Sequence, residues 1–289
     1  MEQTKGCYNM KNLALIYLAF ALIVVTMPFV ADALIDKSDA FTVSVRFSDG
    51  VTEEIGIEEY VLRVLAAREG DITALEAKKA FAVAARSVGM YFATFGCKHS
   101  DFDCCDSGDC CIELASVASA SESTQNAVSE TAGLYLETDN APALALFTLC
   151  ASSGTVQSDE FDYLVSVDSN VRCERHVTEI DFTNGEILDI FPEARDDMKF
   201  YAVYGESNKL SFAIVGGKQI DGAVISTALG LKSKEITITP TENGIKAISY
   251  GVGHGMGLDL CKAERLALDG VYYKKILEIY FPRLNLKGN

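Results

Sequence analysis

Apolar and polar residues between positions 57 and 96 follow the spacing of two consecutive helices. Apolar side chains recur every three to four residues from Ile57 to Leu65, which places them on one helix face. An alanine-rich stretch follows, and Thr73 and Glu76 have the spacing of a capping box at its start. Gly96 is the residue at which we expect the second helix to end. The pattern predicts a tightly packed helical hairpin, because alanine side chains carry little entropic cost in a helix.

The rest of the pattern predicts a mixture of short strands and helices. Strands are expected at 41–47, 133–137, 143–149, 200–204, 210–215, 232–239 and 245–250, and helical segments at 224–231, 258–268 and 272–280. Asn243-Gly244 is a strong turn signal for a hairpin between the last two strands. Residues 159–195 are acidic, and we expect them to be irregular. This order of elements predicts a single α+β domain over residues 36–285, with a mixed helix and antiparallel-sheet architecture.

An almost unbroken apolar run from Leu13 to Val30 precedes the predicted domain. The run is close to the roughly twenty residues that span a bilayer as a helix. Two lysines precede it, so the bulk of the chain is expected outside the cytoplasm. Small residues after the run also resemble a signal-peptide cleavage site, so an anchor and a removable signal both stay open. We therefore expect a short cytoplasmic N-terminus over 1–12 and a membrane-spanning or signal segment over 13–34, in a single-pass membrane protein or, after cleavage, a secreted one.

The charge balance restricts the partners of the chain more than its chemistry. The formal net charge is −16, and no basic stripe interrupts the acidic background. A polyanion would be repelled by such a surface, so nucleic acid is excluded as a partner. The charge does not decide the enzymatic class.

Five of the nine cysteines lie between Cys97 and Cys111. His99, Cys105 and Cys111 are spaced six residues apart, and His and Cys side chains are the ligands that zinc prefers. The rival interpretation is a disulfide between the two Cys-Cys pairs of this loop, because the chain is expected outside the cytoplasm. Zinc, disulfide and unpaired thiols all stay open at this stage.

A glycine-spaced loop surrounds a single histidine near the C-terminus. Tyr250-Gly-Val-Gly-His-Gly-Met-Gly257 presents His254 on backbone that can adopt positive φ and approach a ligand closely. A histidine in this position suits hydrogen bonding or proton transfer, although a structural histidine in a tight turn has the same pattern.

These motifs together resemble those of the stage II sporulation protein D family (SpoIID/LytB). Glu58 to Ser87 resembles the family signature EEYV-x-x-V-x-AAE followed by AVAAR-[TS], and the loop around His254 resembles GxGHGVG. Ser152 and Ser153 lie in a looser match to the family's HSTSGG segment. The matches run in family order from the helical hairpin to Pro282, so the resemblance covers nearly all of the expected exported portion.

The resemblance implies an enzyme that cleaves peptidoglycan glycan strands as a lytic transglycosylase, with a role in engulfment during endospore formation. The family's catalytic glutamate aligns with Arg68, which cannot donate a proton at usable pH. Glu69 is the next residue and becomes the candidate acid. Phe81 stands where the family has a polar glutamine. Some members bind zinc through one His and two Cys after this helix, which supports His99, Cys105 and Cys111 as ligands.

Three functional hypotheses follow. The first is an active glycan-cleaving enzyme that uses Glu69 as acid, with Arg86, Ser152, Ser153 and His254 in the substrate groove. The second is a catalytically impaired relative that binds glycan strands and stimulates a cell-wall amidase or acts with other engulfment proteins. The third is an extracellular binding module stabilised by zinc or disulfides.

Overall fold

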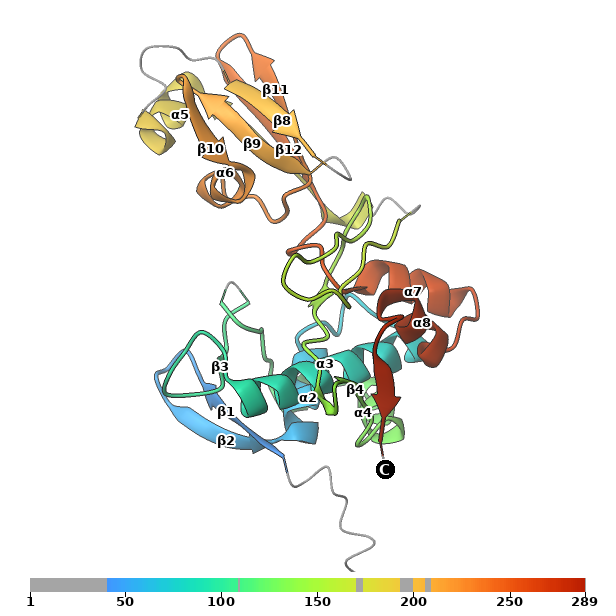
Figure 1. The fold of residues 1–289 in the computed structure, drawn as a ribbon. Helices are drawn as coiled ribbons and strands as arrows, with labels where there is room; N and C mark the ends of the chain where they lie inside the picture. Colours follow the sequence, from blue (N-terminus) through green and yellow to red (C-terminus); the bar gives the residue numbers. More distant parts are fainter. Residues whose placement is uncertain (1–40, 109, 170–173, 193–199, 206–208, 289) are drawn as a thin grey trace, which may run out of the picture.

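Figure 1 shows the fold of the chain in a computed structural model that describes residues 41–108, 110–169, 174–192, 200–205 and 209–288. Helices and strands are mixed throughout this part, which confirms the α+β prediction. The predicted N-terminal segments at 1–12 and 13–34 lie outside the described residues. Among the helices that are described, none combines the length and apolarity needed to cross a membrane. The domain bounds of 36–285 stay a prediction.

The predicted helical hairpin is present as α2 (Ile57–Ala66) and α3 (Leu75–Phe95). The apolar stripe of α2 is buried, and α3 ends at Gly96, whose positive φ of 74° favours glycine. A three-stranded sheet, β2 (Thr52–Gly56), β1 (Thr42–Arg46) and β3 (Cys104–Cys105), joins the hairpin to the cysteine-rich loop.

The predicted capping box at the start of α3 is wrong. The N-cap residue is Ala74, and Thr73 donates its hydroxyl instead to Oε1 of Glu264, at 2.6 Å. Oε2 of the same carboxylate accepts the backbone N–H of Ala74 at 2.9 Å. A carboxylate from the C-terminal part of the chain therefore satisfies this helix N-terminus, where negative charge is favourable.

Helix α3 lies at the centre of the first hydrophobic core, which we call the helical lobe. It packs against α2, α4 (Glu122–Glu130), α7 (Leu260–Leu268), α8 (Tyr273–Tyr280), β1 and β4 (Tyr135–Thr138). Its alanine-rich sequence follows from this position, because elements approach it from several sides and leave little room for larger side chains. Short strands complete the lobe: β5 (Ala141–Pro142), β6 (Phe147–Thr148), β13 (Leu258–Asp259) and β14 (Asn285–Lys287).

A second hydrophobic core forms what we call the sheet lobe, at the top of Figure 1. One antiparallel sheet contains β8 (Phe200–Tyr204), β9 (Leu210–Val215) and β10 (Lys218–Asp221), with α6 (Gly222–Ala228) after it. The other contains β7 (Val177–Thr183), β12 (Gly244–Tyr250) and β11 (Ile236–Thr241). The predicted Asn243-Gly244 hairpin is confirmed, and a Cβ at Gly244 would lie 1.8 Å from the carbonyl oxygen of Phe182.

Two predictions of local structure are wrong. Residues 159–195 are not irregular throughout, because they contain β7 and α5 (Asn184–Ile190), and α5 begins with a capping box between Thr183 and Glu186. The strand predicted at 143–149 shrinks to β6. Ala145 and Leu146 bond back to carbonyls only two residues earlier, so the backbone curls before it can pair with a neighbouring strand.

Candidate functional site

A cleft of about 900 Å³ lies between the helical lobe and the sheet lobe. Its walls come from α2, α3, the cysteine-rich loop, residues 146–149, residues 227–232 and the glycine loop around His254. Five residues of the lining have basic or acidic side chains: Arg68, Glu113, His176, Lys232 and His254. Cys111, which also lines the cleft, is described below with the cysteine cluster.

Arg68 lines this cleft at the point where α2 ends, and its partner there is Glu113. The Arg68 Nη1 atom lies 2.6 Å from Glu113 Oε2. Within the described part of the chain, Glu113 is the only carboxylate residue in the cleft lining. Sequence reasoning missed Glu113, because 45 residues separate it from Arg68 and no motif contains it. The arginine that replaces the expected acid thus lies against a carboxylate of the cleft lining.

Glu69, the predicted acid, lies outside the cleft lining and binds elements of the helical lobe. Its carboxylate accepts hydrogen bonds from Lys78 Nζ at 2.8 Å and from the hydroxyls of Ser121 and Thr124, each at 2.6 Å. Burial raises its pKa, but the hydrogen bonds from these three residues outweigh burial and lower the pKa to about 2. This geometry argues against a proton-donating role and indicates that Glu69 docks α4 onto the hairpin.

Replacing Glu69 by glutamine is expected to destabilise the protein in a pH-dependent way. The carboxylate titrates near 4.5 in an unfolded chain and near 2 in the fold. Its contribution is therefore present above pH 4.5 and lost as the pH falls toward 2. Urea unfolding should show E69Q less stable than wild type at pH 7, with the difference narrowing between pH 4.5 and pH 2.

The matched control for this prediction is Glu278→Gln, because Glu278 is an exposed surface residue in an ion pair with Lys275. Such pairs contribute within about 1 kcal/mol, so this variant should follow wild type at every pH. A constant difference between E69Q and wild type from pH 7 to pH 2 would contradict the role assigned to Glu69.

Arg86, predicted to line the groove, is instead fully buried in the helical lobe. Its guanidinium donates to both carboxylate oxygens of Glu58, at 2.8 and 2.6 Å, and to the carbonyl oxygen of Leu134 at 2.8 Å. This bidentate pair holds α3 to α2 and to the segment that enters β4. The prediction that Arg86 contacts substrate is not supported by this position.

Of the other three predicted groove residues, the structure brings only His254 to the cleft. Ser152 is buried, and Ser153 donates its backbone N–H at 2.9 Å and its hydroxyl to the buried carboxylate of Glu235. Ser153 therefore helps to hold the loop that faces the glycine loop, and neither serine lines the cleft.

His254 is held as a neutral hydrogen-bonding group at the cleft wall. Its Nδ1 atom accepts the backbone N–H of Met256 at 3.1 Å. Desolvation by the surrounding protein lowers its pKa to about 4, although a hydrogen bond to the backbone of Phe147 acts in the opposite direction. The nearby charges of Lys209 and Lys234 lower the pKa further. The His254 residue is itself exposed at the cleft wall, where its imidazole can form hydrogen bonds with polar groups of a ligand.

The glycine loop that carries His254 packs too closely for other residues. Gly253, Gly255 and Gly257 all have positive φ. A Cβ at Gly257 would lie 1.9 Å from the carbonyl oxygen of Leu146. The glycines therefore allow the loop to lie directly on the helical lobe, as the sequence pattern predicts.

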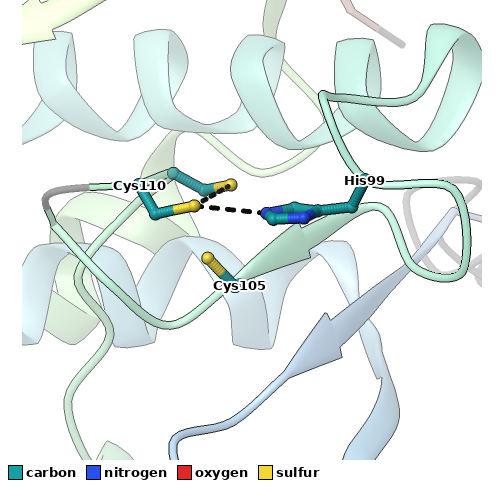
Figure 2. A group of neighbouring side chains, drawn as sticks. His99, Cys105 and Cys110 are labelled. Carbon is teal, nitrogen blue, oxygen red and sulfur yellow. Dashed lines mark hydrogen bonds between the residues drawn. The ribbon is translucent and has the colours of Figure 1, made fainter.

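The cysteine-rich loop gathers four side chains that can hold a metal ion. Figure 2 shows His99, Cys105 and Cys110 pointing toward one another, and Cys111 completes the group. The ligand atoms of all four residues lie within 4.8 Å of one another. His99 Nε2 is 3.2 Å from Cys110 Sγ, and the sulfurs of Cys110 and Cys111 are 3.9 Å apart. The predicted residues His99, Cys105 and Cys111 are thus together, with Cys110 as an unpredicted fourth member.

The cluster fits a tetrahedral ion in both its chemistry and its dimensions. A tetrahedral zinc with metal–sulfur bonds of about 2.3 Å places its ligand atoms about 3.8 Å apart. The five cysteines of residues 97–111 are free thiols in this structure. Parallel pairing of β3 with β1 places Cys105 opposite Arg46, so the cluster lies beside the sheet of the helical lobe.

The family model described as SpoIID, stage II sporulation protein, matches residues 48–137. This stretch contains the helical hairpin, the four metal-binding candidates, Arg68 and Glu113. The match confirms the predicted resemblance over the helical hairpin and the cysteine-rich loop. The resemblances around Ser152 and His254 lie outside the matched residues and stay predictions. No curated protein matches the chain.

Proposed function

We propose, on the premise that this chain belongs to the SpoIID family through residues 48–137, that it binds glycan strands of peptidoglycan without cleaving them. The family implies a sporulation-related cell-wall function. The proposal rests on one observation. The structure has a cleft of the size expected for a ligand, but Arg68 occupies the position of the family's acid in its lining. Glycoside cleavage needs a carboxylic acid to protonate the leaving oxygen, and a guanidinium cannot supply that proton.

The proposed role is to hold and position a strand for another enzyme. A cell-wall amidase or another engulfment protein is the partner that this role requires. The acidic chain is unsuited to nucleic acid, and its predicted N-terminal anchor or signal would place the cleft outside the cytoplasm.

Zinc is the ion we propose for the cluster of His99, Cys105, Cys110 and Cys111. Zinc bound to four protein ligands keeps no open position for substrate, so its contribution there is structural. The cluster lies within the loop that leads to Glu113 and to the cleft wall. In this proposal the ion holds the wall of the cleft in a fixed conformation. Arg68, Glu113 and His254 are the residues that contact the ligand.

Co-sedimentation of the exported portion with purified peptidoglycan tests the proposed function. Wild type should sediment with the wall material. His254→Ala should bind about fivefold more weakly, as expected for the loss of about 1 kcal/mol from one hydrogen bond. Tyr272→Ala is the control, because Tyr272 is highly exposed and does not line the cleft. Wild type that stays entirely in the supernatant would contradict glycan binding.

Glycan cleavage by Glu113 is the second candidate function. The observation that favours it is the position of Glu113 in the cleft lining, 2.6 Å from the residue that replaces the family's acid. This hypothesis requires release of anhydro-sugar products by wild type and their loss in Glu113→Gln.

A further inference from the structure

A small pocket of about 160 Å³ opens beside the cleft and shares Lys232 and His254 with it. Lys232 and Lys234 are exposed, while Leu231, Ser233 and Glu235 between and beside them are buried. This alternation projects both lysine side chains from one face of the segment that leads into β11.

The glycine loop fixes the position of this lysine segment. The backbone N–H of Gly253 donates to the carbonyl oxygen of Lys232 at 2.8 Å, and Ser233 forms a bridge with Gly253. Lys234 is close enough to His254 for its charge to lower the pKa of the imidazole. Two lysines therefore lie beside the histidine that faces the cleft.

The pocket is locally basic in an acidic protein. The chain has a formal net charge of −16, yet none of the described residues that line the pocket is an Asp or Glu. Among the described residues, Lys232 and Lys234 form no ion pair with a carboxylate. The nearest acid in sequence, Glu235, is buried and accepts hydrogen bonds from Ser153. An anion that enters from the cleft would thus meet two ammonium groups that have no carboxylate partner among the described residues.

We propose that Lys232 and Lys234 form a carboxylate-binding subsite that makes the cleft select acidic glycan strands over neutral ones. This proposal rests on the proposed function. Ammonium groups bind carboxylates as point charges, and the volume of the pocket admits a carboxylate with its immediate substituents. In peptidoglycan the carboxylate comes from the lactyl group of muramic acid or from a stem peptide.

Binding to three probes tests the subsite: a neutral N-acetylglucosamine hexamer, glycan strands stripped of stem peptides, and strands with stem peptides. Wild type should bind at least one acidic strand more tightly than the hexamer, and added salt should weaken that preference. Lys232→Met/Lys234→Met should lower the affinity for the acidic strand about tenfold more than the affinity for the neutral hexamer. The strand type that loses affinity identifies the source of the carboxylate.

Lys274→Met/Lys275→Met is the matched control, because it removes the same charge from α8, away from the cleft. It should keep the wild-type preference. Equal affinity of wild type for all three probes, or an equal loss for neutral and acidic probes in the Lys232/Lys234 variant, would overturn the subsite and leave glycan binding intact. Failure of wild type to bind any probe would instead overturn the proposed function.

Discussion

His99→Ala should abolish zinc binding by the cysteine-rich loop and unfold the loop that forms one wall of the cleft. The prediction follows from the cluster of one histidine and three cysteines, whose ligand atoms lie within 4.8 Å of one another. Binding free energy at a structural zinc site is largely folding free energy, of the order of 10 kcal/mol in isolated zinc-binding peptides. Wild type should carry about one zinc per chain by elemental analysis, and H99A should carry almost none. Hydrogen exchange should then rise across residues 97–113.

Cys97→Ser is the control for metal loss. Cys97 lies in the same loop and is partly buried, but its sulfur is outside the four-residue cluster. The variant should keep its zinc and its protection from exchange. The metal site would be contradicted if wild type bound no zinc and a chelator left its hydrogen exchange unchanged. The cysteines of the loop would then be free thiols or form disulfides.

Arg86→Met should lower the free energy of unfolding by about 3 kcal/mol, as expected when one partner of a buried ion pair is removed. The Arg86 side chain is 1% exposed and that of Glu58 is 22% exposed, so the remaining carboxylate would lose its main partner in a poorly hydrated site. The Leu134 carbonyl would lose its donor as well. Urea unfolding of the protein measures the loss.

The control for this prediction is Arg265→Met, which breaks an exposed pair with Asp269 one helical turn away. Such pairs contribute about 0.5 kcal/mol, so the variant should unfold close to wild type. Equal losses in the two variants would show that Arg86 is not the buried connection described above.

The helical hairpin could be predicted because its signals are local. Helical spacing from Ile57 to Leu65, the alanine-rich stretch and Gly96 each depend on neighbours within a few turns. The N-terminal cap of α3 could not be predicted, because the carboxylate that accepts its backbone N–H belongs to Glu264, about 190 residues away. Periodicity therefore identified the elements, while long-range contacts decided how their ends are satisfied.

The candidate site was predictable only where a motif marks it. Two motifs indicate their chemistry from sequence spacing alone. They are the glycines around His254 and the six-residue steps between His99, Cys105 and Cys111. Glu113 and Lys232 belong to no motif that would mark them, because single charged residues are common on any protein surface. Their importance appears only when the fold brings them to one cleft.

Arg86 and Glu69 were also predicted as site residues, and their contacts in the fold are structural ones. Both lie inside the family signature, so the sequence places them close to the expected chemistry. In the fold each is held by hydrogen-bonding partners within the helical lobe: Glu58 and Leu134 for Arg86, and Lys78, Ser121 and Thr124 for Glu69. A signature therefore marks structural residues as strongly as catalytic ones.

Incubation of the protein with purified peptidoglycan, followed by mass detection of anhydro-muropeptides, distinguishes glycan binding from glycan cleavage. Wild type should bind the material and release no more anhydro-muropeptide than a blank without protein, because Arg68 stands where an acid is needed. Release by wild type that is abolished in Glu113→Gln would contradict this prediction and establish an active transglycosylase with a relocated carboxylate.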